Sequence, residues 1–221
     1  MLIARRTLLA ALALVAIAGC SSDDDEPDAP PVIQLGPPGE TGTPLTEDEI
    51  SELEETGYTD ADVAFVQNMI PHHAQALVMT DLVADRTGRD DVPQLAERMD
   101  VSQSDEIALM ERWLEERGEE VPDASAGHDH GDGQLMPGML TEDDLARLEA
   151  ASGRAFDELF LQYMIRHHEG AQVMVAELLS SDEGGQESEV FGLAQHIDSD
   201  QGIEIARMKS LLAEIAASSP S

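Results

Sequence analysis

Two stretches of the chain carry the same set of metal-binding side chains. Each stretch reads Met-Ile-x-His-His, at Met69–His73 and at Met164–His168, and a further methionine follows six residues later, Met79 in the first copy and Met174 in the second. Imidazole and thioether groups together suit copper, especially Cu(I). One such stretch by itself is usually core packing beside a hydrogen-bonded histidine pair. Because apolar packing gives no reason to keep imidazole pairs in both copies, the sequence predicts a metal site.

A second pattern, Gln-x-x-Glu-Ile-x-x-Met, also occurs twice, starting at Gln103 and at Gln201. Its glutamates, Glu106 and Glu204, have three alternative roles: binding metal directly, accepting a hydrogen bond from a ligand imidazole, or facing solvent. The hydrogen-bonding role is favoured, and we expect His72 and His167 to face the interior near these glutamates. The candidate metal-site residues are Met69, His72, His73, Met79, Glu106, Met110, Met164, His167, His168, Met174, Glu204 and Met208.

The first motif must lie on a helix if its side chains are to act together. At about 100° per residue, Asp62, Met69, His72 and Met79 project within an arc of roughly 80°, and His73 lies on its flank. The residues 95 positions later repeat this arc. Each half is therefore expected to present one helix face that holds a carboxylate, an imidazole and two thioethers.

The two halves of the chain are similar throughout. At an offset of 95, ten of the eighteen residues from 62 to 79 are identical, and at an offset of 98, ten of the twenty-three from 92 to 114 are identical. In this second alignment His196 falls opposite Arg98, so no repeated role supports His196 and it is left out of the predicted site. Trp113 is most simply a core residue.

Helical periodicity and helix-start signals predict the elements that position the motifs. Apolar residues recur at spacings of three and four, and Thr46-x-x-Glu49 and Thr59-x-x-Asp62 are typical of helix starts. Neither helical hairpin can bury its apolar stripe alone, so the expected fold class is all-α, with two repeated hairpins packed as a four-helix bundle about a pseudo-twofold axis. The predicted long helices are 60–86, 91–117, 155–180 and 188–217.

The N-terminal residues predict export and a lipid anchor. Arg5 and Arg6 precede a short apolar run and Cys20, an arrangement typical of a signal peptide, and the residues before Cys20 resemble a bacterial lipobox. We expect attachment to the cell membrane at its extracytoplasmic face through a lipid on Cys20, by Sec or twin-arginine export. The predicted parts are a lipoprotein signal peptide, 1–19; a disordered acidic tether, 20–44; and a duplicated helical domain, 45–217, comprising repeat one, 45–121, a linker, 122–139, and repeat two, 140–217.

Composition excludes several kinds of chemistry. Cys20 is the sole cysteine, so the domain has no disulfide, cysteine-based zinc site or thiol nucleophile. The net charge is −34, and about −36 without the signal peptide, because that segment carries Arg5 and Arg6 and no acid. This charge argues against nucleic acid as a partner. The acidity either attracts cations or is an ordinary solvated surface, and the latter is favoured. The sequence identifies no protein partner.

The predicted linker contains a second set of candidate donors. His128, His130, Met136 and Met139 lie among Gly, Pro and Asp residues, which is typical of a flexible loop. Such a segment would capture copper transiently, although a polar loop without metal is the favoured interpretation for the two histidines.

The motifs resemble the DUF305 family (domain of unknown function 305). The family pattern, Phe-x-x-x-Met-Ile-x-His-His-x-x-Ala-x-x-Met followed by Gln-x-x-Glu-Ile-x-x-Met, matches residues 65–79 with 103–110 and residues 160–174 with 201–208. The resemblance covers about residues 46–214 and implies a ferritin-like helical bundle. Some members are periplasmic copper-binding proteins, so the resemblance also favours copper.

The leading functional prediction is a non-catalytic, membrane-anchored protein that sequesters copper or hands it on. Iron and zinc remain alternative metals. Whether the chain is an enzyme is left open. A ferritin-like redox enzyme would need bridging carboxylates, and no histidine here has the glutamate three residues before it that bundle di-iron proteins use. The third alternative is a structural or interaction lipoprotein without metal.

Overall fold

The computed structural model describes residues 33–34, 43–46, 57–123 and 135–218. The described chain is all-α apart from a two-residue antiparallel ladder of β1 (Ile33–Gln34) and β2 (Thr43–Pro44). This ladder belongs to an N-terminal unit, residues 1–54, and the helices belong to a second unit, residues 55–221. The predicted signal peptide, Cys20 and the helix predicted to start at Thr46 lie outside the described residues. Within the described ranges no helix has the length and apolar character needed to span a membrane.

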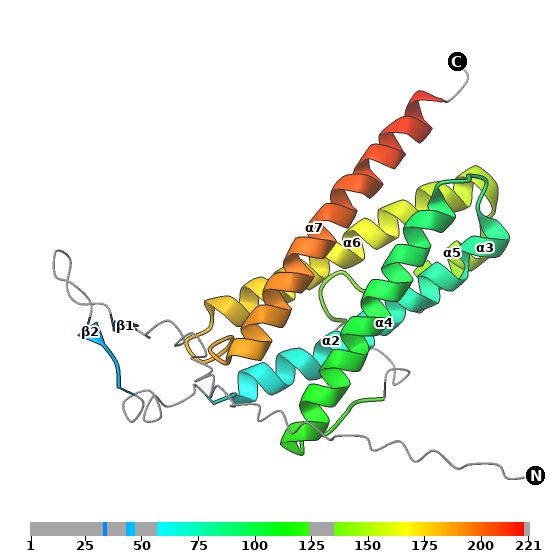
Figure 1. The fold of residues 1–221 in the computed structure, drawn as a ribbon. Helices are drawn as coiled ribbons and strands as arrows, with labels where there is room; N and C mark the ends of the chain where they lie inside the picture. The colour runs from blue at the N-terminus through cyan, green and yellow to red at the C-terminus, as the bar shows by residue number, and fades with distance from the viewer. Residues whose placement is uncertain (1–32, 35–42, 47–56, 124–134, 219–221) are drawn as a thin grey trace, which may run out of the picture. The chain divides into compact units, whose positions relative to one another are not determined.

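Long helices form where the periodicity predicts them (Figure 1). The predicted boundaries agree with those of α4, α6 and α7 within two residues, whereas the first predicted helix, 60–86, is divided at Leu82 into α2 and α3. The helices are α2 (Asp60–Asp81), α3 (Val83–Arg86), α4 (Val92–Arg117), α5 (Glu142–Ala150), α6 (Gly153–Ser180) and α7 (Ser188–Ala217).

Local capping explains where the motif helix begins. The side chain of Thr59 accepts a hydrogen bond from the backbone amide of Asp62, and the Asp62 carboxylate accepts one from the amide of Thr59. This reciprocal arrangement satisfies two amides that the first helical turn leaves free. The helix then continues through Pro71 without ending, although proline removes one amide donor there.

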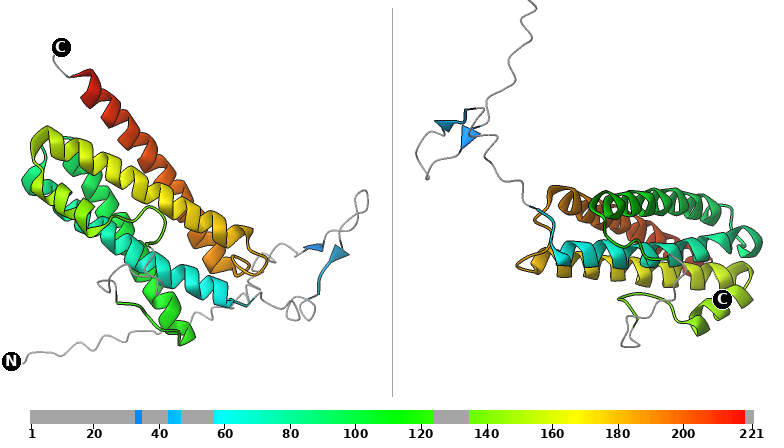
Figure 2. Two further views of the ribbon diagram at one scale, coloured as in Figure 1. Left: turned by 180° about the vertical axis from the view of Figure 1, so that it is seen from behind. Right: turned by 90° about the horizontal axis from the view of Figure 1, so that it is seen from below.

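The helices pack as two pairs joined along their motif helices. The contacts pair α2 with α4 and α6 with α7, and α2 also lies against α6 (Figures 1 and 2). The buried apolar side chains form two clusters, and each cluster draws residues from both halves of the chain. The motif histidines therefore lie where the two halves meet.

The two motif aspartates tie each half to the other. Asp62 accepts a hydrogen bond of 2.6 Å from the amide of Gly185, in the turn between α6 and α7. Asp157 accepts bonds from the Thr87 hydroxyl, 2.6 Å, and the Gly88 amide, 3.2 Å, in the turn before α4. Both carboxylates are almost fully buried. These aspartates, predicted to share a face with the ligands, thus fix the turns and lie about 15 Å along the helix from the histidines.

Candidate metal centre

Four histidine rings form a row across the interior of the helical unit. The rings of His72 and His167 lie 3.9 Å apart between centroids, where α2 meets α6. His73 lies 6.3 Å from His72, and His168 lies 6.2 Å from His167. All four side chains are fully buried. The two copies of the motif therefore bring their imidazoles together, as the repeat predicts.

A glutamate bonds the outer histidine at each end of this row. His73 Nε2 lies 2.7 Å from Glu106 Oε2, and His168 Nε2 lies 2.6 Å from Glu204 Oε2. His72 and His167 face the interior, as expected, and each lies next to the histidine that bonds a glutamate. The bond itself is made by the flanking histidine of each pair, His73 or His168. The first histidine of each pair faces the other hairpin instead.

These bonds determine which nitrogen of the outer histidines can act as a metal donor. A carboxylate only accepts, so the Nε2–H of His73 and of His168 donates to it, and Nδ1 is the ring nitrogen left for a metal ion. Neither Nδ1 atom has a hydrogen-bond partner among the described residues. Glu106 and Glu204 thus orient two imidazoles that present Nδ1 as an unused donor.

The end of the predicted linker covers the inner histidines. The Nε2–H of His72 donates to the carbonyl of Pro137 at 3.1 Å, and the Gln75 side chain makes two hydrogen bonds to the backbone of Leu140, of 2.7 and 3.0 Å. Met136 precedes Pro137 and Gly138, Met139 follows them, and each methionine is 5% exposed. The prediction of a flexible Met136–Met139 segment is therefore wrong, because these bonds fix it to α2. His128 and His130 lie outside the described residues.

Burial keeps the ring of His167, one of the two inner histidines, uncharged. It lowers the pKa of His167 well below the usual range, because loss of hydration penalises the imidazolium, and the nearby rings of His72, His168 and His73 act in the same direction. The backbone of His72 acts weakly in the opposite direction. Neither ring nitrogen of His167 makes a well-formed hydrogen bond within the described ranges. His167 is accordingly a neutral ring at neutral pH, the form that binds metals.

The predicted methionines are all buried, and they fall into two groups. Met69, Met110 and Met174 lie in one apolar cluster together with Met136 and Met139 of the linker. The remaining candidates lie in the other cluster: Met79, Met164 and Met208. Each group combines thioethers from both halves, which are the soft donors that Cu(I) prefers.

Two buried glutamines were seen as a repeated motif but not predicted as site residues. Gln103 and Gln201 are each 2% exposed, and neither the amide nitrogen nor the oxygen has a hydrogen-bond partner in the described chain. Burying such a group unpaired costs about 1–3 kcal/mol. Both glutamines stand one helical turn before the glutamates that bond the histidines, so the unpaired polar groups gather at the level of the imidazole row.

His196, which is outside the predicted site, lies near two carboxylates in the structure. Its Nε2 lies 3.8 Å from Glu106 Oε1 and 3.4 Å from Asp200 Oδ2. The predicted site residues all recur in both halves, whereas the position equivalent to His196 in the first half holds an arginine, Arg98. The sequence does contain one indication of this group: His196 and Asp200 are four residues apart on one helix, so their side chains lie on the same face.

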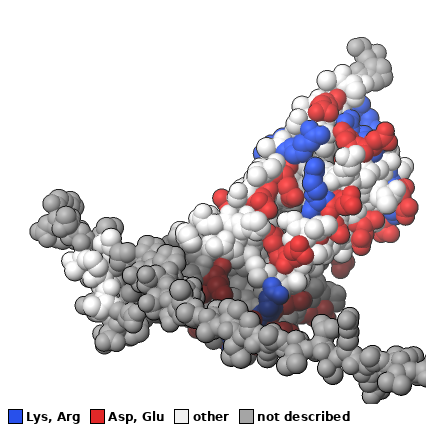
Figure 3. Space-filling model, viewed as in Figure 1, with Lys and Arg blue, Asp and Glu red and all other residues white. Residues whose placement is uncertain are grey.

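The buried interior of the helical unit contains imidazole, amide and thioether groups, all of which are possible metal donors. Unused imidazole nitrogens, unpaired amides and two groups of thioethers fit a soft or borderline ion better than a hard one. A pocket of about 300 Å³ reaches the covering segment from the surface, and its lining includes Met136, Pro137 and Met174. The face of the helical unit seen in Figure 3 carries many acidic side chains with basic ones among them.

Comparisons with solved structures find similar chains of known family. A DUF305 fragment from Deinococcus radiodurans is 32% identical, covering 71% of this chain and 98% of that one, with a TM-score of 0.62. A DUF305 protein from Streptomyces coelicolor, named as a presumed secreted protein, is 30% identical over 71% of this chain and 94% of its own, with a TM-score of 0.60.

Structures of the protein CopM are also similar. Its Cu(II)-bound form is 27% identical, covers 69% of this chain and 96% of its own, and has a TM-score of 0.57; its Cu(I)-bound form is 26% identical, with 72% and 98% covered and a TM-score of 0.55. No curated protein matches this chain in sequence. The family model described as "Domain of unknown function (DUF305)" matches residues 62–212. The chain therefore belongs to the DUF305 family.

Proposed function

We propose that this protein binds copper at the row of histidines between α2 and α6, and that it holds or hands on the ion at the cell envelope without catalysis. The observation that carries the proposal is the continuous row of four buried imidazoles, with a glutamate bonded at each end. The candidate ligands are His72, His73, Met69, Met79, Met110 and their counterparts His167, His168, Met164, Met174, Met208.

The donor chemistry favours copper over the alternatives. Thioethers favour Cu(I), whereas imidazoles bind copper, zinc and iron alike. CopM, which is similar in structure, has been solved with Cu(II) and with Cu(I). A di-iron redox site would place carboxylates between the metal ions. Here Glu106 and Glu204 lie at opposite ends of the row, bonded to His73 and His168.

The proposed architecture is a ferritin-like four-helix bundle made of two repeated hairpins. Its support is the symmetry of the contacts: His72 meets His167, and each motif aspartate bonds the turn of the other half. His72 and His167 are equivalent positions of the two repeats, and the two aspartate contacts are equivalent to each other, as a pseudo-twofold axis requires. A site on this axis would draw equal donors from both halves.

Equilibrium dialysis of the purified helical domain tests the proposal. Samples are dialysed against Cu(I), Cu(II), Zn(II) and Fe(II) at equal concentrations, and bound metal is measured. We expect tight retention of Cu(I), weaker retention of Cu(II) and Zn(II), and little Fe(II), because the donors are thioether and imidazole. Retention of Fe(II) above Cu(I) would instead support the redox alternative, and retention of no metal would support a structural role.

We further propose that a lipid on Cys20 attaches the protein to the outer face of the cell membrane, as the lipobox-like sequence before this cysteine indicates. A Cys20→Ser variant is expected to leave the membrane fraction almost completely, because no other cysteine is present to carry the lipid. Washed membranes and the soluble fraction are compared by immunoblot, with unmodified protein as the control. Variant protein retained in washed membranes would contradict the anchor.

A further inference from the structure

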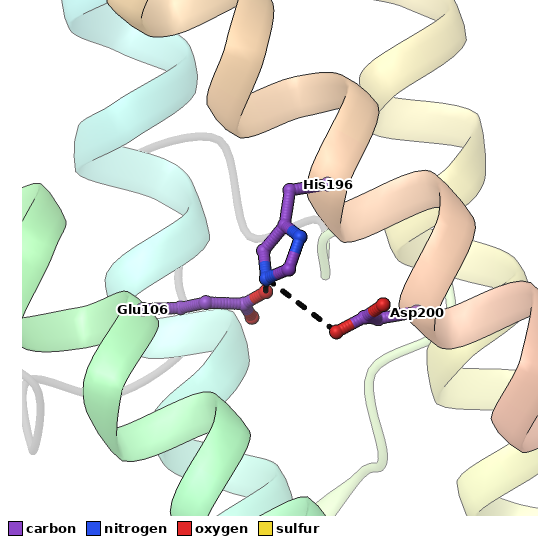
Figure 4. A group of neighbouring side chains, drawn as sticks. All are labelled: Glu106, His196 and Asp200. Carbon is purple, nitrogen blue, oxygen red and sulfur yellow. Dashed lines mark ion pairs between the residues drawn. The ribbon is translucent and has the colours of Figure 1, made fainter.

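A second set of metal-binding donors lies outside the imidazole row. Glu106 of α4 and His196 and Asp200 of α7 direct their side chains toward one another (Figure 4). One donor atom from each residue lies within 4.8 Å of the other two. The His196 and Asp200 side chains are 60% and 39% exposed, so solvent reaches this group, unlike the buried row.

Glu106 gives this group a donor that is already in place. Its side chain is 6% exposed, and its Oε2 is bonded to His73. The other oxygen, Oε1, has no hydrogen-bond partner within the described ranges and faces His196. A buried carboxylate oxygen without a hydrogen bond is costly, and a cation is the partner that would compensate it.

The donors are slightly farther apart than ligands around an ion. His196 Nε2 lies 3.8 Å from Glu106 Oε1 and 3.4 Å from Asp200 Oδ2, the former too long for a hydrogen bond. With metal–ligand bonds of about 2.0–2.1 Å, neighbouring ligands of a tetrahedral ion lie about 3.3 Å apart. Small side-chain movements would therefore bring all three atoms to one ion.

The symmetry-related positions of the two repeats cannot form the same group. Glu204 is the counterpart of Glu106, but the positions equivalent to His196 and Asp200 hold Arg98 and Ser102. A guanidinium has no lone pair to donate and carries the wrong charge for a cation site. The chain thus contains a matched position at which the proposed donors are missing.

We propose that Glu106, His196 and Asp200 form a second, solvent-accessible site for a divalent first-row cation such as Zn(II) or Cu(II). One imidazole and two carboxylates suit these ions and offer no sulfur to Cu(I). The site is distinct from the buried row, although it shares Glu106 with it, and it stands whether or not the row binds copper. The two exposed donors of α7, beside the buried carboxylate of α4, would capture an ion directly from solution.

Zinc titration of the purified protein, followed by calorimetry, tests this site. His196→Ala and Asp200→Asn are each expected to weaken one equivalent of Zn(II) binding by at least about tenfold. Their Cu(I) affinity, measured by chelator competition, should stay unchanged because neither residue belongs to the buried row. The matched control is Asp105→Asn, which removes the same charge from an exposed position on α4 beside Glu106.

A gain-of-function variant makes the test symmetrical. Arg98→His combined with Ser102→Asp places the missing donors at the positions equivalent to those of His196 and Asp200, and is expected to add one Zn(II) equivalent if the symmetry of the repeats holds at Glu204. Three results would overturn the proposal: unchanged zinc binding in both the His196 and Asp200 variants, a loss no larger than that of Asp105→Asn, or no added equivalent in the double variant. The first two would leave the copper proposal untouched, because Cu(I) affinity is measured separately.

Discussion

Replacing Met69, Met79, Met164 and Met174 together by leucine is expected to lower Cu(I) affinity by at least about a hundredfold, which corresponds to about 2.7 kcal/mol. Leucine keeps the volume and apolar character of methionine but deletes the sulfur that Cu(I) prefers. Zn(II) and Cu(II) affinities should fall far less, because those ions depend on imidazole. Competition with a chromophoric Cu(I) chelator measures the change.

The matched control for packing is Met99→Leu. Met99 is fully buried in the same cluster as Met79 and Met164 but is not a candidate ligand. Its replacement should leave Cu(I) affinity unchanged, and each methionine replacement should cost less than about 1.5 kcal/mol of stability. Circular dichroism checks that every variant remains helical.

Histidine variants separate the contribution of the imidazoles to metal affinity from that of the thioethers. Removing the four imidazoles of the row should weaken every metal, since imidazole serves copper, zinc and iron alike. If the quadruple methionine variant bound Cu(I) as tightly as the unmodified protein, the thioethers would be ordinary core residues. The copper proposal would then depend on the histidines and on the similarity to CopM.

Much of this organisation could be predicted from the sequence because it is carried by local patterns. Periodicity located α4, α6 and α7 within two residues, and a threonine–aspartate pair located the start of α2. The repeat identified both histidine pairs, which lie together in the interior. The break at Leu82 was missed, because apolar spacing continues across it into α3.

The remaining features depend on how the helices cross, which a single helix projection does not contain. A projection places His72 at the centre of the motif face and His73 on its flank, but it does not show which of the two bonds a glutamate. In the structure each motif helix contacts two neighbours, and the two histidines face different ones. The group around His196 likewise exists only because α4 and α7 approach each other at Glu106.

The packing of the end of the linker, residues 136–139, against α6 was missed for a related reason. Its composition is typical of a loop, and composition alone does not show whether a loop packs against a helix. Gly170 of α6 supplies that surface: a Cβ built there would lie 2.1 Å from the carbonyl oxygen of Pro137 and 2.6 Å from the Cα of Gly138. Gly138 itself has a φ of 77°, which favours glycine. The two glycines allow two backbones to touch beside the inner histidines.

Gly170→Ala is therefore expected to displace residues 136–140 from α6 and to destabilise the fold by at least about 2 kcal/mol, because backbone atoms cannot yield as a flexible side chain can. The displacement would break the bond from the Leu140 amide to Gln75 and the contact of His72 with Pro137. Hydrogen exchange at Leu140 should accelerate, and denaturant unfolding should give the stability change.

The control is Gly192→Ala, in the second turn of α7, where an added Cβ meets no atom within 4 Å. Alanine should stabilise that helix by about 0.5–1 kcal/mol, since glycine carries the larger entropy cost in a helix. The two substitutions add the same methyl group to a helix and should change stability in opposite directions. If Gly170→Ala were as stable as the unmodified protein and left exchange at Leu140 slow, the segment would not depend on this contact, and its place over His72 would be held by the Gln75 bonds alone.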